Sequence, residues 1–340
     1  MAVTLKEVAR EAGVNLSTAS RSLHATYGVH TATRARVLAV AERLNYHPNR
    51  VARGLVTGRS HTLGLVISDV RNPFFAEVAR GAEDAAYAAG YDLVLCNSDL
   101  DPAKQMHYIR SLLAMRVDGL LMNSVGDLSR ADQEKLAAAG TPIVLLNRSP
   151  KNLGFSTATA DNFQGGFLAG QYLARLGHRA IAHLAGPRQH SNLTDRTRGF
   201  LKAVQSAPAN VSVVVVHGEH SFQGGYEMMK KLLARHRKFT AVFACNDAIA
   251  FGTIRASLEA GLSVPGDLSI VGFDNVEVSS IIHPPLTTVD QPKYELGRAA
   301  MEILLKRTNV PEHRMLGVEL IERQSCRALV GPAAQAGKGK

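Results

Sequence analysis

The chain has 340 residues, of which 46% are hydrophobic and 20% charged, so it is too long for one simple core and shows no sign of wholesale disorder. Its formal net charge of +10 favours polyanionic partners, nucleic acid before anionic membranes. The three cysteines are far apart, and no Cys/His spacing typical of a structural metal occurs, which argues against a disulfide framework and a metal site.

The positive charge is concentrated at the N-terminus. Residues 1–60 hold nine Lys and Arg against three acidic residues, a surplus of six out of the ten for the whole chain. The N-terminus has no apolar signal core, and no apolar run reaches membrane-spanning length. We therefore expect a cytoplasmic protein without a membrane partner, with a small basic module ahead of a larger, nearly neutral one.

Residues 4–24 predict two short helices. Thr4 and Glu7 form a T-x-x-E capping box at the start of the first. Gly13 ends that helix, and Asn15 is a favourable N-cap for a second helix over roughly 16–24. A third helix is expected from about 32 to 45, with a basic linker over 46–61.

The first two helices match a helix-turn-helix, in which the second helix presents its N-terminal side chains to the major groove. Those side chains are Leu16 and Ser17, with Arg21 one turn further on. Arg21 can bind guanine O6 and N7, Leu16 can pack on a thymine methyl group, and Ser17 accepts several partners. The alternative is an ordinary helical hairpin with a solvated Arg21.

From residue 62 the pattern alternates between apolar runs and helical stretches, which is typical of α/β units with parallel sheets. The predicted fold is therefore an all-α helix-turn-helix headpiece followed by an α/β domain of two doubly wound parallel-sheet lobes, divided near residue 161. Residues 331–340 predict a disordered tail. The expected strands are 62–68, 91–97, 118–124, 142–148, 180–186, 211–218, 240–246 and 268–274.

Six segments together resemble the successive signatures of the LacI/GalR family of transcriptional regulators, in order and over about residues 3–330. The segments are VTLKEVAREAGVNLSTASRSLH, RLNYHPNRVARGL, NPFF, DGLL, GFDN and LTTVDQP. The resemblance implies a DNA-binding domain over 1–48, a hinge helix and linker over 49–61, and a periplasmic-binding-protein-like effector domain over 62–330. It implies that the effector domain has a first lobe of residues 62–161 and a second lobe of residues 162–285. The chain would cross between the lobes over 286–292, and the strands at its C-terminal end would belong to the second lobe.

By this resemblance the DNA contacts lie in the headpiece and in a hinge helix over 49–57. Leu55 would fall on the leucine that enters the minor groove, where an apolar wedge between base steps kinks the duplex; a routine core contact of the linker is the alternative. Gly54 lowers the helix propensity by about 1 kcal/mol, so the hinge should order only on DNA. The expected DNA contacts are Thr4, Leu16, Ser17, Thr18, Ser20, Arg21, Asn49, Arg50, Ala52, Arg53 and Leu55.

One position departs from the family pattern. His30 lies where family members often place a small capping residue before the third helix, so Thr31 is expected to cap that helix one residue later.

The resemblance also implies effector contacts from strand ends that face the cleft between the lobes, as α/β folds generally bind ligands outside the carboxyl ends of their strands. Asp161 has an alternative role as the cap of the helix that follows it. Phe75 is interpreted as a core residue. His220 and Phe222 are alternatives for the same position in the cleft. The expected contacts are Ser68, Asp69, Phe74, Asn147, Arg148, Asp161, Arg196, His220, Asn246, Asp274 and Gln291.

An aromatic face with several hydrogen-bonding groups suits a polyhydroxylated ligand. Arg196 can bind two oxygens at once, although an ion pair with Asp274 is the structural alternative for both. Arg148 and His220 add positive potential. We therefore predict a sugar or sugar acid as effector.

Two rival classes fit less well. A periplasmic sugar-binding protein would have a similar second domain but needs an export signal rather than a basic helical module. An enzyme is disfavoured because no GxGxxG after a strand, GxxxxGK[ST], HExxH or GxSxG motif occurs, and no cofactor is implied. The hypothesis is a homodimeric repressor on pseudo-palindromic operator DNA; the tail lacks a leucine heptad, which favours a dimer over a tetramer.

Overall fold

The computed structural model describes residues 3–23, 28–47, 58–125, 128–147, 154–235, 238–308 and 310–329. The chain divides into two compact units, Met1–His61 and Thr62–Lys340. The predicted hinge helix over 49–57, the tail over 331–340 and Arg148 lie outside the described residues, so these predictions stay predictions.

The first unit contains three helices around a small apolar core. They are α1 (Leu5–Glu11), α2 (Leu16–Leu23) and α3 (Thr31–Arg43). Val8 and Ala9 of α1, Ala19 of α2, and Val37 and Ala41 of α3 are buried against one another. Small side chains at these contacts let short helices approach closely enough to form a core of few residues.

The second unit holds two lobes, each built on a six-stranded sheet of the described residues. The first sheet has the order β11-β5-β4-β3-β1-β2, and the second β12-β10-β9-β8-β6-β7. The first lobe comprises β1 (Thr62–Ile67), α5 (Pro73–Ala88), β2 (Asp92–Asn97), α6 (Pro102–Ala114), β3 (Leu120–Met122), α7 (Arg130–Ala138), β4 (Ile143–Leu146), β5 (Ser156–Ala160), α13 (Lys293–Lys306) and β11 (His313–Leu316). The second comprises α8 (Asn162–Arg175), β6 (Ala180–Ala185), α9 (Ser191–Gln205), β7 (Ser212–His217), α10 (Phe222–Arg235), β8 (Ala241–Ala244), α11 (Asp247–Glu259), β9 (Ser269–Asp274), α12 (Val278–Ile281), β10 (Thr287–Asp290) and β12 (Glu319–Ile321).

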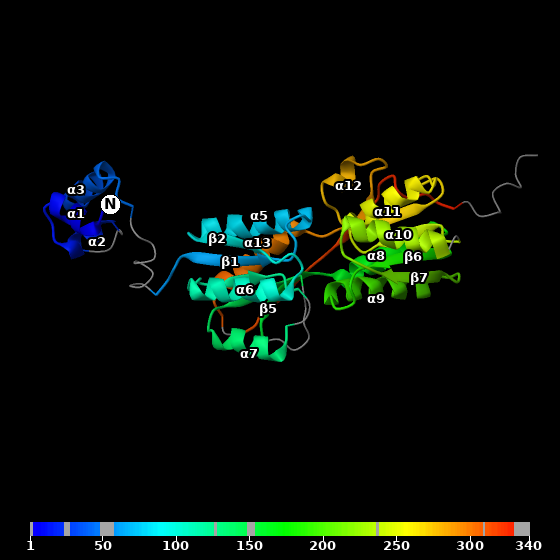
Figure 1. Ribbon diagram of the computed structural model, residues 1–340, viewed down its shortest axis with the longest axis horizontal. Coiled ribbons are helices and arrows are strands. Elements are labelled where there is room, and N and C mark those ends of the chain that lie inside the picture. Colours follow the sequence, from blue (N-terminus) through cyan, green and yellow to red (C-terminus); the bar gives the residue numbers. More distant parts are fainter. Residues whose placement is uncertain are drawn as a thin grey trace, which may run out of the picture. The chain divides into compact units, whose positions relative to one another are not determined.

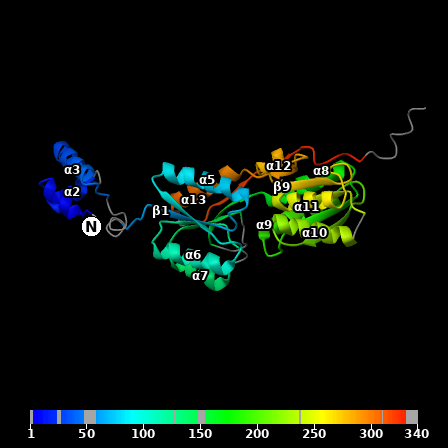
Figure 2. The same cartoon turned by 45° about the horizontal axis from the view of Figure 1, so that its top comes forward.

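Both sheets are covered by helices on both faces, which explains why central strands such as β1, β4 and β8 are nearly continuous apolar runs. In the first lobe, α5 and α13 cover one face and α6 and α7 the other (Figure 1, Figure 2). Successive strand residues point to opposite faces. Leu65 of β1 therefore packs with α5 and α13, while its neighbour Val66 packs with α6.

Three helix pairs approach closely through reciprocal glycines, namely α5 with α13, α8 with α9, and α10 with α11. In the α8–α9 pair, a methyl group on Gly166 would lie 1.9 Å from the carbonyl oxygen of Arg196. One on Gly199 would lie 1.9 Å from that of Phe163. Backbone atoms cannot yield to such a contact, so only glycine permits these helix distances.

All eight predicted strand regions contain strands. β5 and β10 were not predicted, and β11 and β12 are the C-terminal strands that were expected without ranges. β5 has the sequence STATA and lacks large apolar residues, while β10, β11 and β12 are short. The placement of the C-terminal strands in the second lobe is wrong for β11, which pairs with β5 of the first sheet. β12 pairs with β10 and is antiparallel to it. The chain therefore passes between the lobes at Asp161, at 291–292 and at 317–318.

Candidate functional site

The described part of the headpiece presents one face of α2 to solvent. Leu16 is 45% exposed, and Ser17 and Arg21 are also exposed, while Ala19 and Ser22 on the opposite side are buried. Ser17 and Arg21 are four positions apart and share a face of the helix, and Leu16 borders that face at the start of α2. This arrangement leaves two short side chains and one long cationic one available to a ligand.

The start of each headpiece helix is fixed by local caps. Thr4 forms the predicted capping box, because its hydroxyl accepts from the Glu7 amide while the Glu7 carboxylate accepts from the Thr4 amide at 2.7 Å. Asn15 Oδ1 accepts from the Thr18 amide at 2.7 Å, which confirms its predicted capping role for α2. These caps determine where the exposed end of α2 begins.

The capping role assigned to Thr31 is wrong. His30 itself is the N-cap of α3, and its Nδ1 accepts from the Ala32 amide at 3.3 Å. An imidazole nitrogen can replace a hydroxyl oxygen as the acceptor at a helix start. The helix therefore begins at Thr31.

Of the other predicted DNA contacts, Thr18 and Ser20 are half-buried. Arg21 lies back on its own helix, with Nε donating to the Ser17 carbonyl at 3.4 Å, a long hydrogen bond that leaves the guanidinium free to move. The remaining predicted contacts, Asn49, Arg50, Ala52, Arg53 and Leu55, lie outside the described residues.

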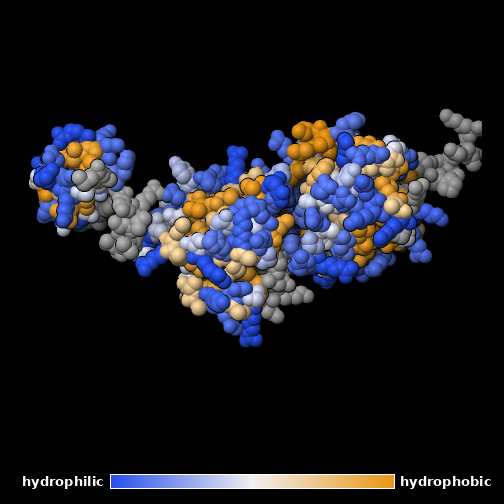
Figure 3. Space-filling view, in the orientation of Figure 1, coloured by the Kyte–Doolittle hydropathy of each residue, from blue (hydrophilic) through white to orange (hydrophobic). Residues whose placement is uncertain are grey.

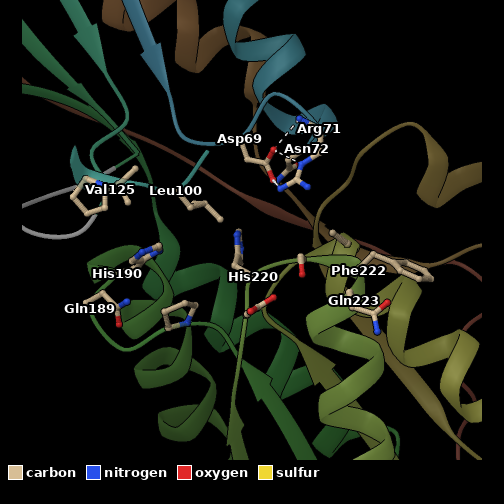
Figure 4. A pocket seen from close by; sticks show the side chains of 15 residues that line it. Asp69, Arg71, Asn72, Leu100, Val125, Gln189, His190, His220, Phe222 and Gln223 are labelled. Atoms are coloured by element: carbon tan, nitrogen blue, oxygen red, sulfur yellow. Dashed lines mark hydrogen bonds and ion pairs between the residues drawn. The ribbon is translucent and has the colours of Figure 1, made fainter. Parts of the chain in front are cut away.

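A cavity of about 740 Å³ opens between the two lobes of the second unit. Asp69, Arg71 and Asn72 of the first lobe line one wall, and His190 and His220 of the second lobe line the other (Figure 4). His220 points into the space between these walls (Figure 4). Phe222, the alternative to His220 for this cleft position, lines the same cavity, so both residues border it.

A smaller cavity of about 30 Å³ lies deeper between the lobes. Ser68, Phe74, Asn147, Arg196 and Asp274, all predicted cleft residues, line it together with His220. Phe74 and Phe75 also line this cavity, and their rings pack edge to face with centroids 5.1 Å apart. Phe75 belongs to the first lobe's core cluster, as interpreted, but so does Phe74, and both rings line the cavity.

The deep cavity adjoins a closed ring of hydrogen bonds that spans the lobe crossings. Asn147 Nδ2 donates to Gln291 Oε1 at 3.4 Å, and Gln291 Nε2 donates to Asp274 Oδ1 at 2.5 Å. Arg196 donates to Asp274 Oδ1 at 3.4 Å and to Asn162 Oδ1 at 2.8 Å. Asn162 Nδ2 closes the ring on Asn147 Oδ1 at 3.3 Å. The long bonds in this ring are those that a hydroxylated ligand could replace at least cost.

Arg196 is held from several sides. Its guanidinium carbon lies 3.6 Å from the centroid of the Phe273 ring, and Nη1 also donates to the Cys245 carbonyl. Burial raises the pKa of the Asp274 carboxyl, and the adjacent Arg196 cation opposes that rise. Arg196 and Asp274 are thus an ion pair within the second lobe, on the wall of the deep cavity.

Of the predicted cleft residues, Asp161, Asn246 and Gln291 line neither of these two cavities, whereas Asp69 does. Asp161 caps α8, accepting from the Gln164 amide at 2.9 Å, which confirms its alternative role. Asn246 caps α11 and is fully buried, with no hydrogen-bond partner for its Nδ2 among the described residues. Gln291 is a member of the hydrogen-bonded ring rather than a lining residue. Asp69 is on the outer wall, where it binds Arg71 bidentately.

Sequence reasoning missed Asn72, Asn162, His190 and Asp247. Asp247 directly follows the predicted residue Asn246, and it is fully buried. Burial and the nearby Asp274 raise the pKa of Asp247 to about 8, so it is mostly protonated at neutral pH. Asp247 directly follows an apolar run predicted to be a strand, and this position was the sequence feature that could have indicated a cleft residue.

Among the described residues, no helix is long and apolar enough to cross a membrane.

Comparisons with known proteins match this architecture. Residues 4–49 match the model of bacterial regulatory proteins of the lacI family, and residues 171–326 match the periplasmic binding protein-like domain. Catabolite control protein A of Priestia megaterium is 37% identical over 311 residues, which cover 91% of this chain and 93% of that protein. The chain belongs to the lacI family.

Two solved lacI-family structures extend this comparison. The lac repressor dimer bound to operator and the anti-inducer ONPF has a TM-score of 0.87, is 30% identical, and covers 96% of this chain and 100% of its own. A lacI-family regulator from Enterococcus faecium with bound ribose has a TM-score of 0.72 and is 33% identical. The match covers 79% of this chain and 100% of that structure's chain. This lacI-family chain is accordingly a DNA-binding transcriptional regulator controlled by a small-molecule effector.

Proposed function

We propose that the protein is a homodimeric repressor whose two α2 helices bind the half-sites of a pseudo-palindromic operator. The exposed face formed by Leu16, Ser17 and Arg21 supports this assignment, since these side chains are free to reach base edges. The similar lac repressor structure is that of a dimer bound to its operator. Apolar side chains gathered over α12, where Ile281 is 76% exposed, support contact with a second copy (Figure 3).

The effector is a sugar or sugar acid that binds between the lobes. The single observation that carries this proposal is that the 740 Å³ cavity, which is large enough for a sugar, shares His190 and His220 with the deep cavity, where Phe74 and the Arg196–Asp274 pair lie. A sugar carries several adjacent hydroxyl groups, which bind well to a site that has an aromatic face beside hydrogen-bond donors and acceptors. The ribose seen in the Enterococcus faecium relative supports a sugar of similar size.

Thermal unfolding with a panel of pentoses, hexoses and sugar acids tests the effector class. A ligand at one hundred times its Kd stabilises the folded state by about 2.7 kcal/mol, which raises Tm measurably. Asp274→Asn should abolish the rise. Asp267→Asn, which removes an exposed carboxylate that accepts from Ser263 away from the cleft, should keep it. No rise with any sugar would reject this effector class.

Selection of bound sequences from random DNA tests the operator proposal, because the selection requires no assumption about the operator sequence. The full chain should enrich one pseudo-palindrome whose half-sites are related by two-fold symmetry. Sedimentation on that DNA should give two chains per duplex. A tetramer, or an enriched site without symmetry, would contradict the dimer.

A further inference from the structure

The end of β9 and the turn that follows it contain two successive residues in a conformation that side chains disfavour. Asp274 has φ of 110° and Asn275 has φ of 50°. Non-glycine residues seldom adopt positive φ, and they keep it only where surrounding groups hold the backbone.

The Lys293 ammonium lies against the carbonyl oxygens of both strained residues. Nζ is 2.8 Å from the Asp274 oxygen and 3.0 Å from the Asn275 oxygen, and both can accept its protons. Asp290 Oδ1 at 3.0 Å and the Gln291 carbonyl at 3.2 Å complete the surroundings. The side chain is only 12% exposed, so these four oxygens replace most of its hydration.

Asn275 is held on its other side as well. Its Nδ2 donates to Asp290 Oδ1 at 2.8 Å, and its Oδ1 accepts from Arg323 Nη2 at 2.7 Å. The ammonium and these side-chain bonds therefore fix both carbonyl groups and the direction of the turn.

Lys293 joins the two lobes. It is the first residue of α13, whose core residues pack in the first lobe, while Asp274 ends β9 of the second lobe. Val276, in the same turn, is buried in the first lobe's core cluster. A single cation thus connects the strand end beside the cleft to a helix of the other lobe.

We propose that Lys293 is a positioning residue that holds the Asp274–Asn275 turn and thereby directs the Asp274 carboxylate toward Arg196 and Gln291 in the cleft. Movement of this turn on effector binding is passed to α13 through the same ammonium. The effector part of this inference rests on the proposed function, but the holding of the turn does not.

Hydrogen exchange of the ligand-free full chain tests the holding role directly. The Val276 amide donates to Asp247 Oδ2 at 2.9 Å and reports on the turn. Lys293→Met should accelerate exchange in peptides covering 274–279 at least tenfold. Lys306→Met, which removes an ammonium of the same helix that pairs with Glu312 at the surface, should leave it unchanged. Equal exchange in wild type and Lys293→Met would overturn the inference.

Calorimetric titration with D-ribose tests the positioning role. Lys293→Met should bind ribose at least tenfold more weakly than wild type at a temperature where both are folded, and Lys293→Arg should recover part of the affinity. Unchanged ribose affinity in Lys293→Met would overturn positioning. If the wild type itself does not bind ribose, the proposed ligand fails, and the exchange experiment still decides the role of Lys293.

Discussion

At the scale of single residues, exposure separates the headpiece side chains that pack in its core from those that can contact a ligand. Leu16, Ser17 and Arg21 are exposed although the helix that carries them packs on α1 and α3. An exposed apolar residue beside a cation on a short helix has no packing purpose of its own. We propose that contact with operator DNA gives both side chains a partner.

We predict that Arg21→Ala weakens binding to the selected operator by about 1–3 kcal/mol and relaxes the preference at one base position. The measurement is competition binding against operators changed one base pair at a time. Arg43→Ala is the control, because it removes the same charge at the far end of α3, where Arg43 pairs with Glu11. An unchanged base preference in Arg21→Ala would exclude Arg21 from base recognition.

Arg196 and Asp274 form an ion pair in which both side chains are almost fully buried. Removal of one buried partner leaves the other charge uncompensated and costs about 3–5 kcal/mol, whereas neutralising both removes that penalty. Arg196→Met should lower the free energy of unfolding by this amount, and the double variant with Asp274→Asn should be more stable than Arg196→Met alone. Urea unfolding measures both. A strictly additive double variant would show that the pair is not coupled.

At the scale of elements, closely packed helix pairs hold the cleft residues in place. Arg196 is on α9, whose approach to α8 depends on Gly166 and Gly199. The same approach brings Asn162 at the start of α8 within 2.8 Å of Arg196 Nε. Helix spacing is therefore part of the geometry of the site.

We predict that Gly199→Ala destabilises the second unit by about 1–3 kcal/mol, because the new methyl group meets the Phe163 backbone and the helices must separate. Gly317→Ala is the matched control, since a methyl group there meets nothing within 4 Å. Denaturant midpoints of the two variants give the comparison. Equal midpoints would mean that the α8–α9 contact can relax.

Strand prediction succeeded where burial on both faces produced continuous apolar runs, as in β1 and β9. It failed at β5, because a strand of Ser, Thr and Ala carries no hydrophobic signal although most of it is buried. Only its partners β4 and β11 make it a strand. Long-range pairing overrode local composition at this position.

At the scale of the whole molecule, buried histidines link stability to pH. His183 is fully buried, and its ring stacks on Phe243 with centroids 4.8 Å apart. Its Nδ1 lies 3.0 Å from the Phe243 carbonyl, which can only accept, so Nδ1 carries the proton. Burial lowers the pKa of His183 from 6.5 to about 4.

The sign of the effect follows from proton binding. Between pH 6.5 and 4 the unfolded chain binds a proton at this histidine that the folded chain does not, so stability falls as pH falls. The loss attributable to His183 should reach about 3 kcal/mol near pH 4. Unfolding free energies measured across this interval test it, and His183→Gln should show a shallower decline. Parallel curves for the two proteins would refute the assignment.

Local patterns were enough to predict the three headpiece helices, eight strand regions, the cap at Asn15, the exposed residues Leu16, Ser17 and Arg21 of α2, and many of the residues around the cleft. Each depends on local periodicity or on the rule that ligands bind at the carboxyl ends of parallel strands. The tertiary structure decided the rest. It placed β11 in the first sheet, put Asn246 at a helix cap rather than on the cavity wall, and brought Lys293 against the turn at Asp274. Those contacts join residues distant in sequence or in separate lobes, and no local pattern encodes which of them meet.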